Sequence, residues 1–235
     1  MVLVTLWNPV GSPVTAGAAG TITTTVTPVN LGDLAVCVQS NEGGAAGPIP
    51  SGGGVATWIN AANIQGIVNP DPGWSNLGAT ERSSIYFGII TATGSQTLTV
   101  TGSTGLGCVY QEFEYTGASS YSQDAGVASY FQNNQGPAGP SSGNFGPVTP
   151  SGAGKELLIG VAFHLSTPTI TGCVSVTTPV TNFGGFVSMF YILDADTAGG
   201  PYSPGWSLSG ASAEADFATC FEASAAPLNQ IIMIV

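Results

Sequence analysis

Hydrophobic and polar residues alternate along most of this chain with a period of two. The clearest case is the run 107–117, where Val109 and Phe113 share one face and Glu112 and Glu114 share the other. A period of two is typical of a half-buried β-strand, because apolar positions on a helix recur every three or four residues. Gln111 falls on the apolar face of this run and is expected to need a hydrogen-bonding partner there.

Similar short runs occur throughout the chain, and no segment of helical length shows a period near 3.6. The expected strands are 2–7, 21–27, 31–38, 84–90, 96–101, 107–117, 155–163, 187–193, 205–210, 216–223 and 230–235. Thirty-four glycines and sixteen prolines punctuate them. The pattern predicts an all-β fold, and a chain of 235 residues can form one antiparallel β-sandwich domain over 1–235.

Two stretches depart from the strand pattern and predict long Gly/Pro/Ser-rich surface loops. The first, 41–70, is a surface excursion with one weak strand around Trp58. The second, 118–150, is expected to be an irregular crossover between sheets or a surface arm. Long loops in compact domains often carry a binding role, so Trp58 is the candidate partner contact of this chain.

The two halves of the sequence echo each other. The motif Gly32-Asp33-Leu34 corresponds to 154–157, and Phe113-Glu114 corresponds to Phe221-Glu222. The offsets between corresponding motifs are not constant. We interpret this as a loose internal duplication, of the kind that a jelly roll with two half-motifs would give.

Charged residues are scarce. Lys155 and Arg82 are the only strong bases against thirteen acids, which gives a net charge of −11. Without a basic patch the chain is not expected to bind nucleic acid or an anionic membrane. Residues 1–7 lack a basic segment and a long apolar run, and no apolar stretch is long enough to span a membrane. Synthesis and folding in a cytoplasm are therefore expected.

The four cysteines are far apart and lie in or beside strand-like runs. They are Cys37, Cys108, Cys173 and Cys220. Their spacing does not match a zinc site, and we favour buried free thiols over disulfides.

Glu112 and Glu114 are the main candidates for catalytic chemistry, because two carboxyl groups on one face of a strand resemble the acid and nucleophile of a glycosidase. The alternative is that both are solvated on the outer face, where changing both to glutamine would cost less than about 0.5 kcal/mol. We favour the alternative, because the sequence lacks the additional acidic and aromatic residues of such a site.

Other candidate sites are weaker. His164, the only histidine, has no nucleophile motif beside it and is expected to be structural. Asp194 and Asp196 offer too few oxygens for calcium and are expected to cap a turn. The tryptophans could stack on sugar rings, as in lectins, although buried packing is their more common role. They are Trp7, Trp58, Trp74 and Trp206.

The order of several motifs carries a resemblance to a known family. These motifs are Gly32-Asp33-Leu34-Ala35-Val36, Pro72-Gly73-Trp74, Ile85-Tyr86-Phe87 with Ala92 and Gly94, Tyr115-Thr116-Gly117, Asp124 and Glu156-Leu157-Leu158-Ile159. In them the chain resembles a jelly-roll family of phage minor tail and other virion-surface proteins, which has a concanavalin-like sandwich. The resemblance covers 20–165 best and implies a structural role, with no catalytic residues carried over.

The first functional hypothesis is therefore a non-enzymatic phage virion protein, located on the particle as a capsid decoration or minor tail component. Its expected partners are capsid or tail subunits and copies of itself. The second hypothesis is a glycan-binding module for attachment to a host or cell surface. A glycoside hydrolase is the third and has the weakest support. No catalytic residue, cofactor or metal site is expected.

Overall fold

The computed structural model describes residues 6–42, 49–61, 81–101, 105–133, 142–145, 147–151, 154–164, 166–180, 185–209 and 214–225. This part of the chain folds entirely into antiparallel β-sheets, as the sequence predicts. Among these residues there is no helix long and apolar enough to cross a membrane.

The described residues of the first half form eight strands. They are β1 (Trp7–Ala18), β2 (Thr21–Val26), β3 (Leu34–Glu42), β4 (Ser51–Gly52), β5 (Ile59–Asn60), β6 (Glu81–Ile89), β7 (Gln96–Thr101) and β8 (Leu106–Tyr115). The described residues of the second half form eight more. They are β9 (Ala118–Asn133), β10 (Ser142–Asn144), β11 (Glu156–His164), β12 (Pro168–Thr171), β13 (Val174–Pro179), β14 (Phe186–Ala195), β15 (Gly205–Leu208) and β16 (Glu214–Ala225).

Both halves arrange their strands in the same order. The first half forms the sheets β1-β8-β3-β6-β5 and β2-β7-β4, and the second forms β9-β16-β11-β14-β13 and β10-β15-β12. Adding eight to each strand number of the first half gives its counterpart in the second. An order of 1-8-3-6 in one sheet and 2-7-4 in the other is that of a jelly roll. The duplication indicated by the sequence is therefore a duplication of topology.

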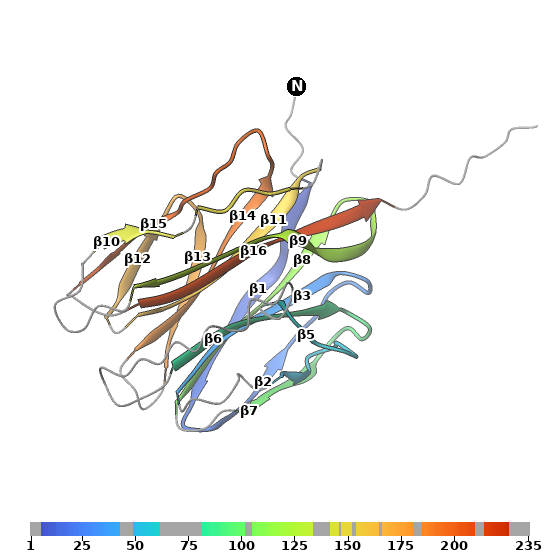
Figure 1. The fold of residues 1–235 in the computed structure, drawn as a ribbon. Coiled ribbons are helices and arrows are strands. Elements are labelled where there is room, and N and C mark those ends of the chain that lie inside the picture. The colour runs from blue at the N-terminus through green and yellow to red at the C-terminus, as the bar shows by residue number, and fades with distance from the viewer. Residues whose placement is uncertain are drawn as a thin grey trace, which may run out of the picture.

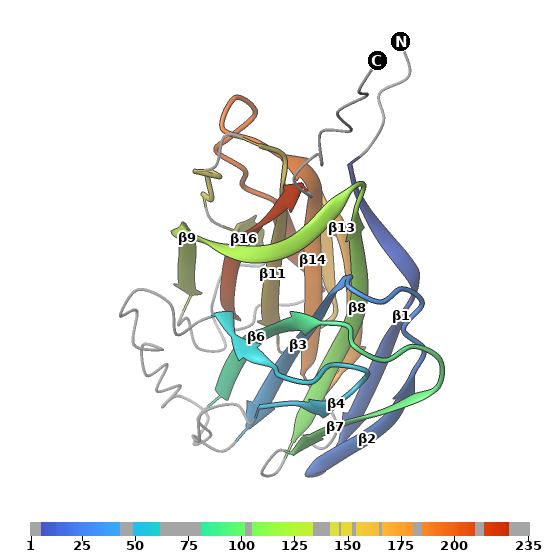
Figure 2. The same ribbon diagram turned by 90° about the vertical axis from the view of Figure 1, so that its right-hand side faces the viewer.

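The four sheets pack in layers. The two five-stranded sheets face each other, and each small sheet covers the outer face of its own large sheet, so that β2-β7 and β10-β12-β15 lie on opposite sides of the molecule (Figure 1). Figure 2 shows the same layers after a quarter turn. The first half meets the second through one shared core, so the described residues form one packed unit.

Three hydrophobic cores fill the spaces between the layers. The central core contains Phe113 and Phe221, whose rings come from equivalent strands of the two halves. A second core lies under β2-β7-β4 and includes Tyr110, and a third lies under β10-β15-β12 and includes Phe190. Because the large sheets are covered on both sides, a strand such as β8 is buried along both faces from Leu106 to Phe113.

Some sequence predictions of strand positions were wrong. Residues 118–133 of the expected crossover form the long strand β9, which pairs with β16 at the edge of its sheet. Strand β1 (Trp7–Ala18) was not predicted, and residues 2–5 of the expected first strand lie outside the described residues. In the excursion 41–70 the structure places the short strands β4 and β5, on either side of a bridge at Val55. The expected strand 230–235 lies outside the described residues, as does part of the excursion.

Candidate functional site

A cluster of three acids lies on the outer face of the first large sheet, at the turn that leads into β3. Glu112 accepts hydrogen bonds from the backbone N–H groups of Val29 (2.8 Å) and Asn30 (2.9 Å). The Asn30 side-chain amide donates to Asp33 (3.1 Å) and to Glu114 (3.2 Å). The acids therefore anchor the turn 27–33 to β8.

The structure corrects the prediction that both glutamates are solvated. They do share one face of β8, but the Glu112 side chain is only 2% exposed and Glu114 is half-buried. Both Glu112 oxygens are engaged by main-chain donors, so this residue is an anchor of the turn. Asp33, which the sequence did not single out as part of a site, completes the cluster and is also buried. Burial, together with the adjacent Glu112 carboxyl group, raises the pKa of Asp33 to about 7.

A cavity of about 360 Å³ opens beside this cluster. It lies where β1 bulges between Val10 and Val14, and Val29 and Glu112 form part of its wall. Bulges often occur where a strand turns a side chain away from regular pairing. The cavity has one carboxyl group and otherwise mostly apolar walls.

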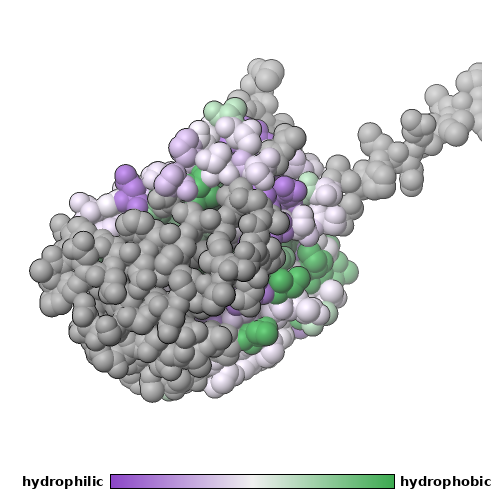
Figure 3. Space-filling model, viewed as in Figure 1, coloured by the Kyte–Doolittle hydropathy of each residue, from purple (hydrophilic) through white to green (hydrophobic). Residues whose placement is uncertain are grey.

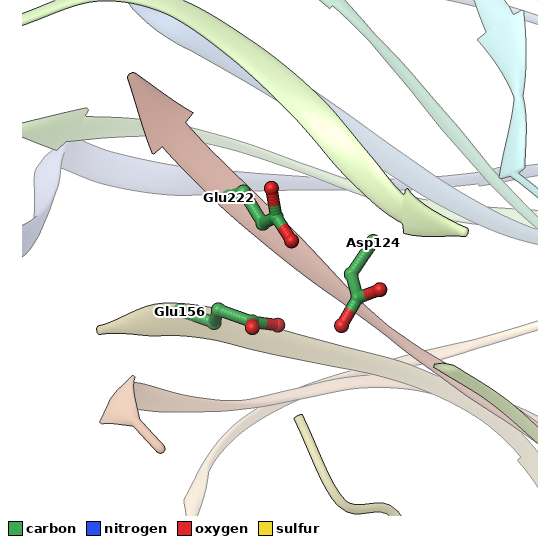
Figure 4. A group of neighbouring side chains, drawn as sticks. All are labelled: Asp124, Glu156 and Glu222. Carbon is green, nitrogen blue, oxygen red and sulfur yellow. The ribbon is translucent and has the colours of Figure 1, made fainter. Parts of the chain in front are cut away.

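A second cluster of three acids lies in the other half of the molecule (Figure 4). Asp124 comes from β9, Glu156 from β11 and Glu222 from β16, and one carboxylate oxygen from each lies within 4.8 Å of the others. Asp124 and Glu156 are buried and Glu222 is half-buried. Asp124 accepts two hydrogen bonds from Ser151, from its backbone N–H (2.8 Å) and its hydroxyl group (2.6 Å).

Carboxylate oxygens are the ligands preferred by hard divalent cations such as Ca²⁺ and Mg²⁺, which take six or more oxygens in all. The second cluster supplies three. Its third strand also carries Cys220, whose pKa is raised well above its usual value by burial and by the negative charges of Glu156 and Asp124. The sequence did not predict this cluster, because its members come from three strands that are distant in the chain.

The two clusters occupy equivalent positions in the duplicated topology. Leu34 pairs with Phe113 across β3 and β8, and Leu157 pairs with Phe221 across β11 and β16. The residue before each leucine is an acid, Asp33 or Glu156, and the residue after each phenylalanine is Glu114 or Glu222. The third acid differs: Glu112 corresponds to Cys220, and Asp124 instead comes from β9, at the edge of the sheet.

His164 is buried, and its pKa is lowered to about 3 by that burial. Its ring lies between Phe145 and Trp206, with ring centroids 6.3 Å away in each case. These contacts support the interpretation of His164 as a structural residue.

Asp196 caps a turn, as expected, whereas Asp194 holds the start of a distant strand. Asp194 accepts hydrogen bonds from the N–H groups of Leu6 and Trp7 (2.9 Å to Trp7), which fixes the start of β1 against β14. Asp196 accepts from the Gly199 N–H (2.6 Å) and forms an exposed ion pair with Lys155.

The structure corrects the assignment of Trp58 as a partner contact. Its side chain is 7% exposed, its Nε1–H donates to the Gly52 carbonyl oxygen (3.1 Å), and its ring packs edge-on against Tyr110. Trp7 and Trp206 are also buried, and Trp74 lies outside the described residues. None of the described tryptophans therefore offers an exposed ring on which a sugar could stack.

The prediction of free thiols is confirmed for all four cysteines. Cys37 and Cys108 lie close together under the first small sheet, where the pKa of Cys37 is raised by its hydrogen bond with Cys108 and by burial. Thiols of this kind react slowly, because the reactive species is the thiolate.

Comparison with known proteins found no matching family model, no matching curated protein and no matching solved structure.

Proposed function

We propose that this chain is a non-enzymatic structural protein of a phage particle, serving as a capsid decoration or minor tail component on the particle surface. The observation that carries the proposal is the duplicated jelly-roll order together with the scarcity of charged residues, which make up 6% of the chain. Jelly rolls are common in viral capsid proteins and in lectins. Fold alone does not determine function, so the nature of the surface supplies the second part of the argument.

The uncharged surface is clearest on the outward face of β2 and β7. Three cross-strand pairs of threonines line it, Thr21 with Thr101, Thr23 with Thr99 and Thr25 with Thr97. Most of the surface coloured in Figure 3 is pale, which marks residues of intermediate hydropathy. Protein interfaces are depleted of Lys and Glu, and short side chains lose less rotamer entropy than lysine when they are immobilised. Such a face suits permanent contact with other virion subunits.

The arrangement of the acids also supports a structural role over catalysis. Glu112 and Asp124 each accept hydrogen bonds from donors of a neighbouring turn. A general acid or nucleophile must instead direct an oxygen at a substrate. In this proposal the acids shape the turns, and the particle partners contact the outer sheets.

Quantitative mass spectrometry of density-purified particles from the phage that encodes this chain tests the proposal. We expect a fixed number of copies per particle that persists through a second density gradient, whereas host cytoplasmic proteins decline between gradients. A protein found only in the soluble lysate, or lost in the same way as the host proteins, would contradict the proposed function.

A further inference from the structure

We propose that strand β2 is the edge through which two copies of this chain pair. The two β2 strands run antiparallel about a two-fold axis and join the small sheets of both copies into one sheet, β4-β7-β2-β2-β7-β4. Copies of the chain are among the partners expected from the sequence, and this inference identifies the surface that they use. It rests on the pairing, charge and sequence of β2 and does not depend on the proposed particle role.

Strand β2 has one open side. It pairs with β7 along its whole length, from Thr21 to Val26, and no other described strand pairs with it. Figure 2 shows β2 at the rim of the molecule, with β7 beside it. The N–H and C=O groups on the open side of an edge strand are a template for pairing with another chain.

The other sheet edges in the described part of the chain are short or interrupted. Strands β4 and β5 have two residues each, and β10 has three. Strand β1 contains Pro9, Pro13 and a bulge, β12 begins at Pro168, β13 ends at Pro179, and β9 is broken by two shifts of register. Proline and bulges are devices that prevent edge-to-edge pairing, and β2 has neither.

The charge of the small sheet fits a second copy of itself. The chain carries a net charge of −11, which opposes self-association in general. Strands β2, β7 and β4 nevertheless contain no charged residue, so pairing through β2 places no acid of these strands against another. A strongly basic or acidic partner would find no complementary charge on this sheet, whereas another uncharged edge matches it.

The sequence of β2 is also self-complementary, as a two-fold interface requires. The run Ile22-Thr23-Thr24-Thr25-Val26 has the same pattern in both directions. An axis at Thr24 places Ile22 opposite Val26 on the buried face and Thr23 opposite Thr25 on the exposed face. Cross-strand pairs of threonines and of β-branched apolar residues stabilise a sheet. An axis at Thr23 would instead place Ile22 opposite Thr24, so the register centred on Thr24 is favoured.

The expected dimer is a weak one. A strand of six residues is about 20 Å long, and pairing along it buries less surface than a standard protein–protein interface. We therefore expect a reversible dimer whose population rises with protein concentration. In that dimer the exposed threonines of β2 and β7 form one continuous face across both copies.

Sedimentation velocity of the purified full chain at low salt, from about 1 μM to about 1 mM, tests the pairing and its register. The wild type should show a monomer–dimer equilibrium. Combining Thr23→Lys with Thr25→Lys places lysine opposite lysine twice and should lower the association constant at least about tenfold. Combining Thr23→Lys with Thr25→Glu places lysine opposite glutamate twice and should keep the association constant within about threefold of the wild type.

The matched control places the same two charges on the inner strand of the same sheet. Thr97→Lys combined with Thr101→Lys changes exposed positions of β7, as the first variants change exposed positions of β2. Because β7 does not face the partner strand, this control should associate within about threefold of the wild type. Loss of association in the control would place the contact on the face of the sheet and overturn the proposed edge.

A wild type that stays monomeric over the whole concentration range would overturn the proposal. Equal losses in the lysine–lysine and lysine–glutamate variants would also overturn it, because the register would then be wrong. If the lysine–lysine variant does not fold, oxidation of a mixture of Thr23→Cys and Thr25→Cys chains decides, with the disulfide mapped by mass spectrometry. A disulfide between positions 23 and 25 of the two chains supports the pairing, and its absence excludes it.

Discussion

Replacing Glu112 with glutamine tests whether this buried acid anchors the turn before β3. The amide side chain keeps one acceptor oxygen and places an NH₂ group against the second backbone N–H of Val29 or Asn30. A donor left without an acceptor costs about 1–3 kcal/mol, and the surviving hydrogen bond loses its charge assistance, which is worth about 1 kcal/mol more. We therefore expect Glu112→Gln to lower the free energy of unfolding by about 2–4 kcal/mol.

Urea denaturation at pH 6 is the suitable assay, because Asp33 is then largely protonated and relief of charge repulsion does not mask the loss. Glu114→Gln is the matched control on the same strand. Among the described residues its oxygen accepts from the Asn30 amide, which a glutamine oxygen can still do, so a change within about 0.5 kcal/mol is expected. Equal and small effects of the two substitutions, with unchanged m-values, would refute the anchoring role of Glu112.

Two further predictions concern the cores. Gly160→Ala should destabilise the protein by at least about 1–3 kcal/mol in thermal or urea unfolding, because an added Cβ would overlap the Phe190 ring. Gly154→Ala, whose Cβ would meet nothing within 4 Å, should have little effect, and equal effects of the two substitutions would contradict the close packing of Phe190 on Gly160. Thiol titration should find four free thiols after denaturation without reductant, with the buried ones slow to react in the native protein, and a denatured count of zero would contradict the free cysteines.

The alternation of side chains predicted most strands and the fold class, because each strand has at least one face toward a core. It did not reveal that the outer faces of the large sheets are covered too. Tyr110 shares a face of β8 with Glu112 and Glu114, which was expected to be solvated, yet it lies in the core under β2-β7-β4. A period of two reports where side chains point along one strand, and it contains no information about a third layer contributed by distant residues.

Strand β9 and the acidic clusters also depend on residues distant in the sequence, which the pattern along one strand does not reveal. Residues 118–133 are rich in small polar residues, and their strand depends on pairing with β16 at the sheet edge, which local pattern does not encode. Glu156 and Glu222 did appear in the motifs that linked the two halves, so the duplication was visible. That they lie beside Asp124 could be predicted only from the pairing register of β9, β11 and β16, which the sequence pattern does not give.

The most direct test of the proposed particle role is a cryo-EM comparison of wild-type particles with particles assembled without this chain. The account predicts a difference density on the outer surface of the head or the tail, into which the two packed jelly-roll halves fit as one body. Identical maps from the two preparations would contradict the assignment of this chain as a virion structural protein.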